Sequence, residues 1–438
     1  MKTFEKGSKK LINAWAFYDW ANSVYSLVIS TAVFPIYYSS ITESFDNVEG
    51  DIQFLGTSWN PTTLYDYTLA FSFLIVAFIS PILSGIADYT GNKLKFIKFF
   101  CLLGSLSVMA LFFFKGEETL WVAIVFTITA SIGFWGSIVF YNAYLPEVAY
   151  PEQQDNVSAK GFMLGYAGSI LLLIFSLIMV QKPEWFGITD ATLAPRITFL
   201  IVGVWWLGFA QITYRKLPNN VYSHKPKKDY ILKGFRELKI VAKDLVNYPQ
   251  LRTFLISFFF YSVGVQTIIL MAGIFGSKEL GLPTINLILT ILLVQIVAIF
   301  GAFLFSRLSN RIGNLKALKI TIAIWGIVCF TAFMLDKEQP NVTAYFYALG
   351  GLIGLVMGAI QSLSRSTYSK LLPETEDHAT YFSFYDVAEK IAIVLGMIIF
   401  GLLIALTNSM QWSVLFLGVF FVIAFIILST ITKTKYVE

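Results

Sequence analysis

The chain has few of the residues on which most enzyme chemistry depends, with two cysteines and two histidines among 438 residues. Cys101 and Cys329 fall in separate apolar segments, so we expect packing residues there rather than a disulfide or a metal site. His224 and His378 stand alone in polar connections, which excludes zinc sites and catalytic triads built on histidine. No phosphate-binding loop of the Walker type occurs, so ATP hydrolysis is not expected. The sequence therefore predicts neither an enzyme nor a bound cofactor.

Charged residues are also scarce: they make up 13% of the chain, whereas 56% is hydrophobic and the mean hydropathy is +0.69. Soluble proteins average about 25% charged residues, so this composition is typical of an integral membrane protein. A spanning helix needs about 20 mostly apolar residues. That window predicts twelve transmembrane helices, near residues 11–38, 64–87, 96–114, 119–144, 157–181, 196–214, 251–275, 284–306, 316–335, 343–368, 382–406 and 411–432.

One pattern occurs in both halves of the chain. The motif Leu145-Pro146-Glu147 reappears as Leu372-Pro373-Glu374, and the segment 91–93 has a weaker counterpart at 313–316. The sequence therefore predicts an all-α membrane protein of two pseudo-symmetric six-helix bundles, residues 1–214 and 251–438, joined by a cytoplasmic linker at 215–250. Two similar bundles that rock against each other can expose one site alternately to each side of a membrane, as in a transporter.

The distribution of positive charge predicts the orientation of the chain, because lysine and arginine are retained on the cytoplasmic side during insertion. With both termini in the cytoplasm, all but five of the 32 lysines and arginines lie on the inner side. Residues 225–243 of the linker are basic, with apolar residues at helical spacing opposite the charges. This pattern predicts a helix that lies on the anionic lipids of the inner leaflet. The alternative is a solvated linker with fortuitous periodicity.

The turn after the second predicted helix, residues 84–93, carries the strongest local motif. Asp88 can accept hydrogen bonds from the amides that begin a neighbouring helix, and Gly91 permits a tight reversal. Such a contact would hold the cytoplasmic side shut and break when the halves tilt, although an ordinary polar turn is the alternative. The copy in the second half has Asn310 in place of the aspartate, so we expect a weaker gate there. The gate residues expected in these two turns are Ser84, Asp88, Gly91, Lys93, Asn310 and Gly313.

The same turn resembles the signature between the second and third helices of the major facilitator superfamily. Residues 14–23, 80–88, 141–147, 361–366 and 384–387 look like the bacterial branch of the autophagy-related vacuolar amino-acid effluxer family. The resemblance covers essentially the whole chain, and the Tyr18-Asp19-Trp20-Ala21-Asn22 block is fairly specific to that family. It implies the two-bundle facilitator fold, a bacterial cell membrane, and small solutes such as amino acids or related metabolites.

Ionisable side chains within predicted helices mark a candidate solute site, since a charge at the bilayer centre costs at least about 2.5 kcal/mol. Asp19 lies about two turns into the first helix, and Asn22, Ser23 and Ser26 continue its polar stripe. We expect the stripe to face a central cavity, with Asp19 binding a proton or a substrate ammonium group. The alternative is a structural counter-ion to a nearby basic residue. On the tenth helix, Arg365 is the natural partner for a substrate carboxylate.

Neutral amides accompany these charges and favour a neutral or internally compensated solute over a polyanion. Each amide taken singly is explained equally by hydrogen bonding between helices. The amides assigned to the site are Asn142, Gln266, Gln295 and Gln361.

Three charged residues share a face of the eleventh helix: Asp386, Glu389 and Lys390. The apolar run that follows them is short, so we place them near the cytoplasmic surface and assign them to the gate. Taken together, the sequence predicts a secondary active transporter of a small polar solute, working by alternating access and coupled to protons through Asp19. A scramblase-like lipid-handling protein and a non-transporting sensor on the same fold are the alternatives.

Overall fold

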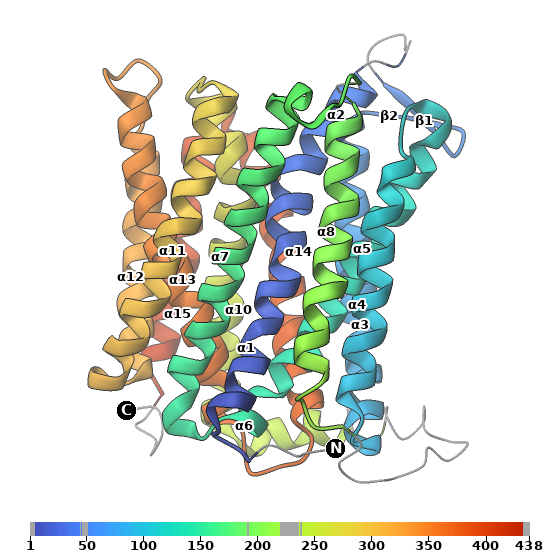
Figure 1. Cartoon of the computed structure of the whole chain (residues 1–438). Helices are drawn as coiled ribbons and strands as arrows, with labels where there is room; N and C mark the ends of the chain where they lie inside the picture. The colour runs from blue at the N-terminus through green and yellow to red at the C-terminus, as the bar shows by residue number, and fades with distance from the viewer. Residues whose placement is uncertain are drawn as a thin grey trace.

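The computed structural model describes residues 5–43, 45, 51–190, 192–219, 236 and 239–431. Within these ranges, twelve helical spans are long and apolar enough to cross a membrane, which confirms the predicted all-α membrane fold. The spans run side by side and roughly parallel (Figure 1). The start of α1 (Lys9–Val24) and the end of α15 (Met410–Ser429) lie at the same end of the molecule, which we call the terminal end.

The first half of the chain supplies six spans. The first span is continuous from α1 through a π-helical segment, η1 (Tyr25–Val33), into α2 (Phe34–Thr42). A short antiparallel hairpin of β1 (Ile52–Phe54) and β2 (Thr57–Trp59) follows at the end opposite the terminal end. The remaining helices of this half are α3 (Pro61–Thr90), α4 (Lys93–Ala110), α5 (Leu120–Ala143), the short α6 (Leu145–Val148), α7 (Gln154–Gln181) and α8 (Leu193–Tyr214).

The second half supplies the other six spans: α10 (Pro249–Ile274), α11 (Thr284–Ile312), α12 (Asn314–Phe333), α13 (Val342–Leu371), α14 (His378–Thr407) and α15. Short 3-10 or π turns flank several helices, at η3 (Leu111–Phe113), η4 (Glu117–Thr119), η5 (Pro151–Gln153), η6 (Pro183–Phe186), η7 (Leu245–Asn247) and η8 (Phe275–Glu279). The proposed interfacial helix at 225–243 falls largely outside the described residues, so its attraction to anionic lipid stays a prediction.

The two halves meet through a few helices. In the first half α1 packs on α7 and α8, and α4 packs on α5 and α8; in the second half α11 packs on α13, and α15 packs on α10 and α12. Contacts between the halves run from α14 to α3 and α5, and from α7 to α11 and α13. Membrane helices associate through close packing and interhelical hydrogen bonds rather than through the hydrophobic effect. The polar residues on these six helices therefore decide how the halves are held together.

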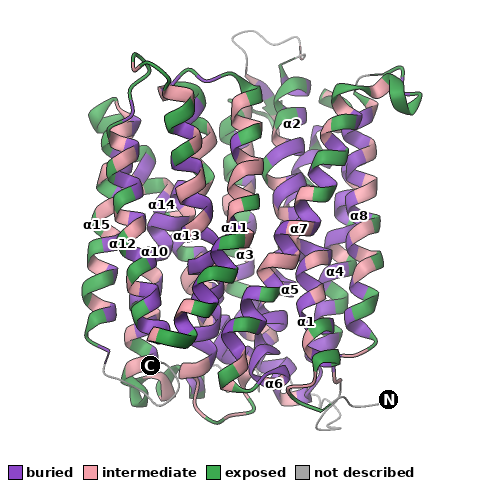
Figure 2. Cartoon of the chain, turned by 60° about the vertical axis from the view of Figure 1, so that its left-hand side comes forward, coloured by how far each residue is buried: buried purple, intermediate pink, exposed green. Residues whose placement is uncertain are grey.

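Burial is concentrated toward the terminal end. Every residue from 362 to 369 near the end of α13 is buried, and α3 is more buried in its last two turns than in its first two. Figure 2 shows the same trend, with buried segments gathered around α6 and the adjoining parts of the helices. The halves are therefore closed against each other at the terminal end.

Several helices extend beyond their predicted ends. The fifth span begins at Pro151 rather than at 157, and α14 begins at His378 rather than at 382. The expectation that His378 stands alone in a loop is therefore wrong. These added turns are polar, and they are buried by packing against other helices rather than by lipid, so a hydropathy window does not register them.

Candidate functional site

An ion pair between Asp19 and Arg365 joins the two halves. Asp19 lies ten residues into α1, about 15 Å from its start at 1.5 Å per residue. Arg365 lies six residues before the end of α13. Both Nη1 and Nη2 of Arg365 donate to Asp19 Oδ2, each at 3.3 Å, and both side chains are at least nine-tenths buried. The two residues that the sequence analysis assigns to opposite ends of a solute are thus bound to each other in this conformation.

Groups from α5 and α7 complete the surroundings of this pair. The Tyr141 hydroxyl donates to Asp19 Oδ2 at 2.7 Å. Arg365 donates through Nε to Ser158 Oγ at 3.0 Å, through Nη2 to Ser158 O at 2.8 Å, and through Nη1 to Asn142 Oδ1 at 3.2 Å. Asn142 thus lies beside the pair, and so do Tyr141 and Ser158, which were not assigned to the site. The guanidinium also lies over aromatic rings, 4.2 Å from the ring centre of Phe162.

Two glycines of α7 let its backbone approach α1 at the site. A Cβ on Gly161 would lie 2.3 Å from Asp19 Oδ2 and 2.9 Å from Arg365 Nη2. A Cβ on Gly165 would lie 2.5 Å from Ser23 Oγ. These contacts are far shorter than van der Waals distance, so only glycine fits beside the pair without displacing it.

The neutral polar residues assigned to the site do not all lie in one place. Gln361 Oε1 accepts a 2.6 Å hydrogen bond from Tyr166, which again joins α13 to α7. Asn22 is fully buried and its Nδ2 has no partner among the described residues, whereas Ser23 and Ser26 are partly exposed. Gln266 belongs to a different cluster, described below, and the described structure records no side-chain hydrogen bond for Gln295.

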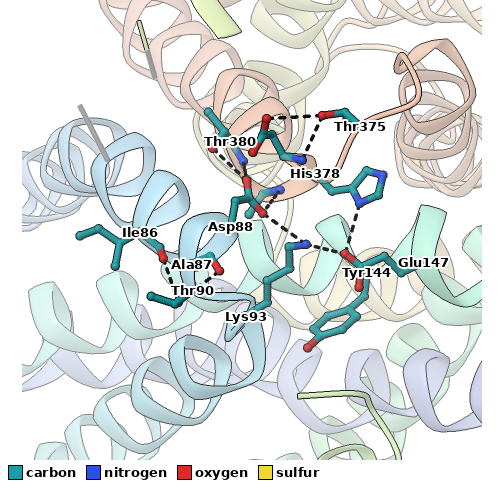
Figure 3. A network of polar contacts seen from close by, with 12 residues as sticks. Ile86, Ala87, Asp88, Thr90, Lys93, Tyr144, Glu147, Thr375, His378 and Thr380 are labelled. Atoms are coloured by element: carbon teal, nitrogen blue, oxygen red, sulfur yellow. Dashed lines mark hydrogen bonds and ion pairs between the residues drawn. The ribbon is translucent and has the colours of Figure 1, made fainter. Parts of the chain in front are cut away.

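At the terminal end, Asp88 binds the start of α14, where Figure 3 shows its surroundings. The amides of Ala379 and Thr380 donate to its carboxylate at 3.1 and 2.7 Å, and the Thr380 hydroxyl donates at 2.9 Å. This contact is the one expected of a carboxylate in the 84–93 turn. Gly91 ends α3 with φ of +65°, a conformation that favours glycine and reverses the chain into α4.

Lys93 connects Asp88 to α6. Its Nζ lies 3.2 Å from Asp88 Oδ1 and also forms an ion pair with Glu147. The Glu147 carboxylate lies 3.2 Å from Nδ1 of His378, the first residue of α14. We call this group of five residues, Asp88, Lys93, Glu147, His378 and Thr380, the Asp88 cluster. Ser84 lies nearby in sequence, and its buried Oγ has no partner among the described residues.

A second group, the Asp155 cluster, joins the first turn of α7 to the second half. Asp155 accepts from Ser309 Oγ at 3.0 Å, from Asn314 Nδ2 at 2.7 Å and from Lys370 Nζ at 2.8 Å. The Asp155 side chain is 1% exposed and that of Lys370 is 6% exposed. This group lies at the turn between α11 and α12, which corresponds in the second half to the turn between α3 and α4 at the Asp88 cluster.

The two residues assigned to the weaker second gate lie beside this cluster. Asn310 donates from Nδ2 to Asn156 Oδ1 at 3.2 Å on the exposed surface. Gly313 ends α11 with φ of +87° and so delivers Asn314 to Asp155. The turn in the second half therefore does have a carboxylate beside it, although Asn310 is not one, because α7 of the first half supplies Asp155.

Asp386, Glu389 and Lys390 form a third group, the Lys390 cluster, within α14. Lys390 lies twelve residues into α14, about 18 Å along a helix of about 45 Å. Lys390 therefore lies further along its helix than predicted, since the helix begins four residues earlier, and the assignment of these residues to the gate stays a prediction. The described structure records no contact between this cluster and the Asp88 cluster.

Sequence reasoning missed Asp155, Glu147, Lys370 and His378. The repeated Leu-Pro-Glu motif contained a signal for Glu147, which is partly buried while its counterpart Glu374 is exposed. No such signal marks Asp155, whose partners lie more than 150 residues away along the chain. In the described part of the chain, no group of three or more His, Cys, Asp or Glu residues is arranged to hold a metal ion.

Comparison with known proteins places the chain in a family. The family profile described as "Vacuole effluxer Atg22 like" matches residues 7–436. The relative named "Uncharacterized MFS-type transporter YxiO" from Bacillus subtilis is 35% identical, over 99% of this chain and 96% of its own length. Autophagy-related protein 22 of Coccidioides immitis is 24% identical, over 90% of this chain and 82% of its own length.

Solved structures show the same fold at low identity. The proton:xylose symporter XylE, bound to 6-bromo-6-deoxy-D-glucose, superimposes with a TM-score of 0.71 at 15% identity, covering 98% of this chain and 97% of XylE. The human organic anion transporter MFSD10 gives 0.71 at 12% identity, covering 96% and 99%. The protein is a multi-pass membrane transporter of the major facilitator superfamily and not an enzyme. Within that superfamily, the chain belongs to the vacuole effluxer Atg22-like family.

Proposed function

We propose that the protein moves a small polar solute with both a cationic and an anionic group, such as an amino acid or a related metabolite, by alternating access. The observation that supports this most directly is the buried Asp19–Arg365 pair, because its members belong to different halves. Separating the halves would leave two unpaired charges within the membrane, which is costly. A zwitterionic solute removes that cost, because its ammonium group can bind Asp19 while its carboxylate binds Arg365.

The geometry of the pair leaves room for this exchange. The three hydrogen bonds to the Asp19 carboxylate all reach Oδ2, and none from the described residues reaches Oδ1. The Arg365 fork is directed at a single oxygen, whereas a solute carboxylate would offer two oxygens and form two parallel hydrogen bonds. Proton coupling follows from the same atoms, because a proton on Asp19 would cancel its charge and release Arg365 for the solute.

The distribution of lysine and arginine supports a cytoplasmic terminal end. The likeness to a Bacillus subtilis relative supports a bacterial cell membrane. The conformation described here, closed at the terminal end, would then be closed toward the cytoplasm. In that state the Asp88 and Asp155 clusters form the cytoplasmic gate, and Asp19 and Arg365 lie behind it.

Uptake of a labelled amino-acid mixture into proteoliposomes, with and without a pH gradient, tests the proposal. We expect wild-type uptake to respond to the gradient, Arg365→Lys to lower uptake roughly tenfold or more, which corresponds to about 1.4 kcal/mol, and Asp19→Asn to remove the pH response. Arg307→Lys, at an exposed position of α11, serves as the matched control. An Asp19→Asn protein that still accumulates solute with unchanged pH dependence would contradict the coupling role. Full uptake by Arg365→Lys would contradict the solute site.

A further inference from the structure

The Lys390 cluster is a second group of buried charges, separate from the Asp19–Arg365 pair. Lys390 Nζ lies 3.1 Å from Asp386 Oδ1 and 2.9 Å from Glu389 Oε2. The Lys390 side chain is fully buried, that of Asp386 is 4% exposed and that of Glu389 is 16% exposed. Two carboxylates therefore share one ammonium group within a membrane-spanning helix.

No other charge on the neighbouring helices balances this cluster. Among the helices that pack on α14, α5 and α15 contain no Asp, Glu, Lys or Arg. The charged Arg365 of α13, which contacts α14 through Tyr368, is already paired with Asp19. The only charged residue of α10 is Arg252 in its first turn, and α3 has only Asp66 and Asp88, near its two ends. With both carboxylates ionised, the cluster holds one uncompensated negative charge inside the membrane, where charges are costly.

The groups that face the cluster from these helices are uncharged. Gln266 of α10 donates to Glu389 Oε1 at 2.9 Å, and the ring of Trp135 on α5 lies 3.4 Å from Lys390 Nζ. Ser80 of α3 lies beside Asp386. The second carboxylate oxygen of Asp386, Oδ2, is buried and has no hydrogen-bond partner among the described residues. A buried acceptor without a donor is unfavourable, so this atom identifies where a missing proton would be held.

We propose that the Lys390 cluster is a proton-binding site distinct from the Asp19–Arg365 pair, and that it holds one proton, on Asp386, while the terminal end is closed. The proton removes the excess charge and turns the unpaired oxygen from an acceptor into a hydrogen-bond donor. A metal cation fits less well, because the Lys390 ammonium group already occupies the space between the two carboxylates, and hard cations require several oxygen ligands.

The site lies between the two halves, which links its protonation to their movement. Trp135 and Ser80 belong to the first half, whereas the three charged residues belong to the second. When the halves separate at the terminal end, Lys390 loses the aromatic ring and water reaches Asp386, so the carboxylate ionises and the proton leaves on that side. This release step rests on the proposed alternating access, whereas proton binding in the closed state does not.

Infrared spectroscopy of the full chain in lipid nanodiscs tests the site without any solute, by titrating the carbonyl band of protonated carboxylic acids against pH. We expect a protonated-acid band near neutral pH that Asp386→Asn removes. Asp19→Asn and the exposed control Asp336→Asn should both retain it. An unchanged band in Asp386→Asn would overturn the site, whatever the result of the uptake assay.

Two further variants keep the proposal testable if Asp386→Asn fails to fold. Lys390→Gln removes the ammonium group from beside the two carboxylates, so we expect the band to persist to higher pH; an unshifted titration would overturn the site. Asp88→Ala weakens closure of the terminal end and should reduce the band at the same pH. A band of full intensity in an Asp88→Ala protein that is open by cysteine labelling would overturn the release step.

Discussion

The two halves close the terminal end with the same electrostatic arrangement but with different residues. In the Asp88 cluster the carboxylate belongs to the end of α3 and reaches the first amides of α14. In the Asp155 cluster the carboxylate belongs to the first turn of α7 itself, and its donors are side chains of the other half. Both arrangements place a negative charge at the N-terminus of a helix, where the helix dipole stabilises it.

The two clusters differ in how many partners each cation has. Lys93 contacts two carboxylates, those of Asp88 and Glu147. Lys370 has Asp155 as its one acidic partner among the described residues, with Asn314 Oδ1 as a neutral acceptor at 3.0 Å. The pseudo-symmetry of the halves therefore preserves the position of the negative charge but not the number of acidic partners of the nearby lysine. The Asp155 cluster should be the more sensitive of the two to a single substitution.

Asp155→Ala should have the largest effect, because it leaves the buried Lys370 ammonium group without an anion. Breaking a buried ion pair in this way costs about 3–5 kcal/mol. We expect the closed state to weaken by that amount, seen as a rise of roughly 100-fold or more in maleimide labelling of Ser362→Cys in a background without Cys101 and Cys329.

The double variant Asp155→Ala with Lys370→Ala supplies the control for this experiment. Removing both partners leaves no unpaired charge, so labelling should return toward the wild-type rate. Equal labelling in the single and double variants would show that the ion pair is not what holds this part of the interface.

Asp88→Ala should weaken the closed state less than Asp155→Ala does. Each substitution removes three hydrogen bonds to a charged acceptor, so the difference between them lies in the cation that is left behind. Lys93 keeps Glu147 as a partner, whereas Lys370 keeps no acidic partner among the described residues. The same labelling assay should show a smaller increase than for Asp155→Ala. The reverse order would contradict the redundancy inferred for the Asp88 cluster.

Gly161→Ala tests whether α7 must pass close to the Asp19–Arg365 pair as well as carry Asp155. The added methyl group would overlap Asp19 Oδ2, and overpacking of this kind costs about 1–3 kcal/mol. We expect a lower thermal stability and a weaker solute response. Gly208→Ala on α8, where a Cβ would meet nothing within 4 Å, is the matched control and should behave as wild type.

Asn310→Asp should have the smallest effect. It restores in the second half the residue found at position 88, but Asp155 already supplies the negative charge at the N-terminus of α7. Because Asn310 is exposed, we expect a change in the free energy of closure below about 0.5 kcal/mol. If Asn310→Asp stabilised the closed state by as much as Asp88→Ala destabilises it, the second half would lack an anion that the first half has.

The number and order of the spans could be predicted from hydropathy alone, because lipid requires long apolar helices. The ends could not, as the first turn of α7 shows: Gln154, Asp155 and Asn156 are polar, and two of the three are buried by packing within the protein rather than by lipid. The π-helical segment η1 within the first span also has no sequence signal that we identified.

Within the site, Asp19, Arg365 and Asp88 were identified because each is a charged group in an otherwise apolar context. Their partners were harder to find, since pairs such as Asp19 with Arg365 are separated by 346 positions in the chain. Whether the carboxylate faced a cavity or a basic residue was left open by the sequence, and the structure pairs it with arginine in the closed state. The position of Lys390 along its helix was also misjudged, because α14 begins with a polar turn that lies outside the predicted apolar run.

The most direct test of alternating access is the distance between the two halves at the terminal end. Spin labels on Glu152→Cys and Lys316→Cys, both exposed and in different halves, can be measured by double electron–electron resonance in nanodiscs without Cys101 and Cys329. We expect one short distance in the otherwise wild-type protein and an additional, longer distance when Asp155→Ala is introduced. A single unchanged distance in both proteins would contradict the conclusion that these ion pairs hold two moving halves together.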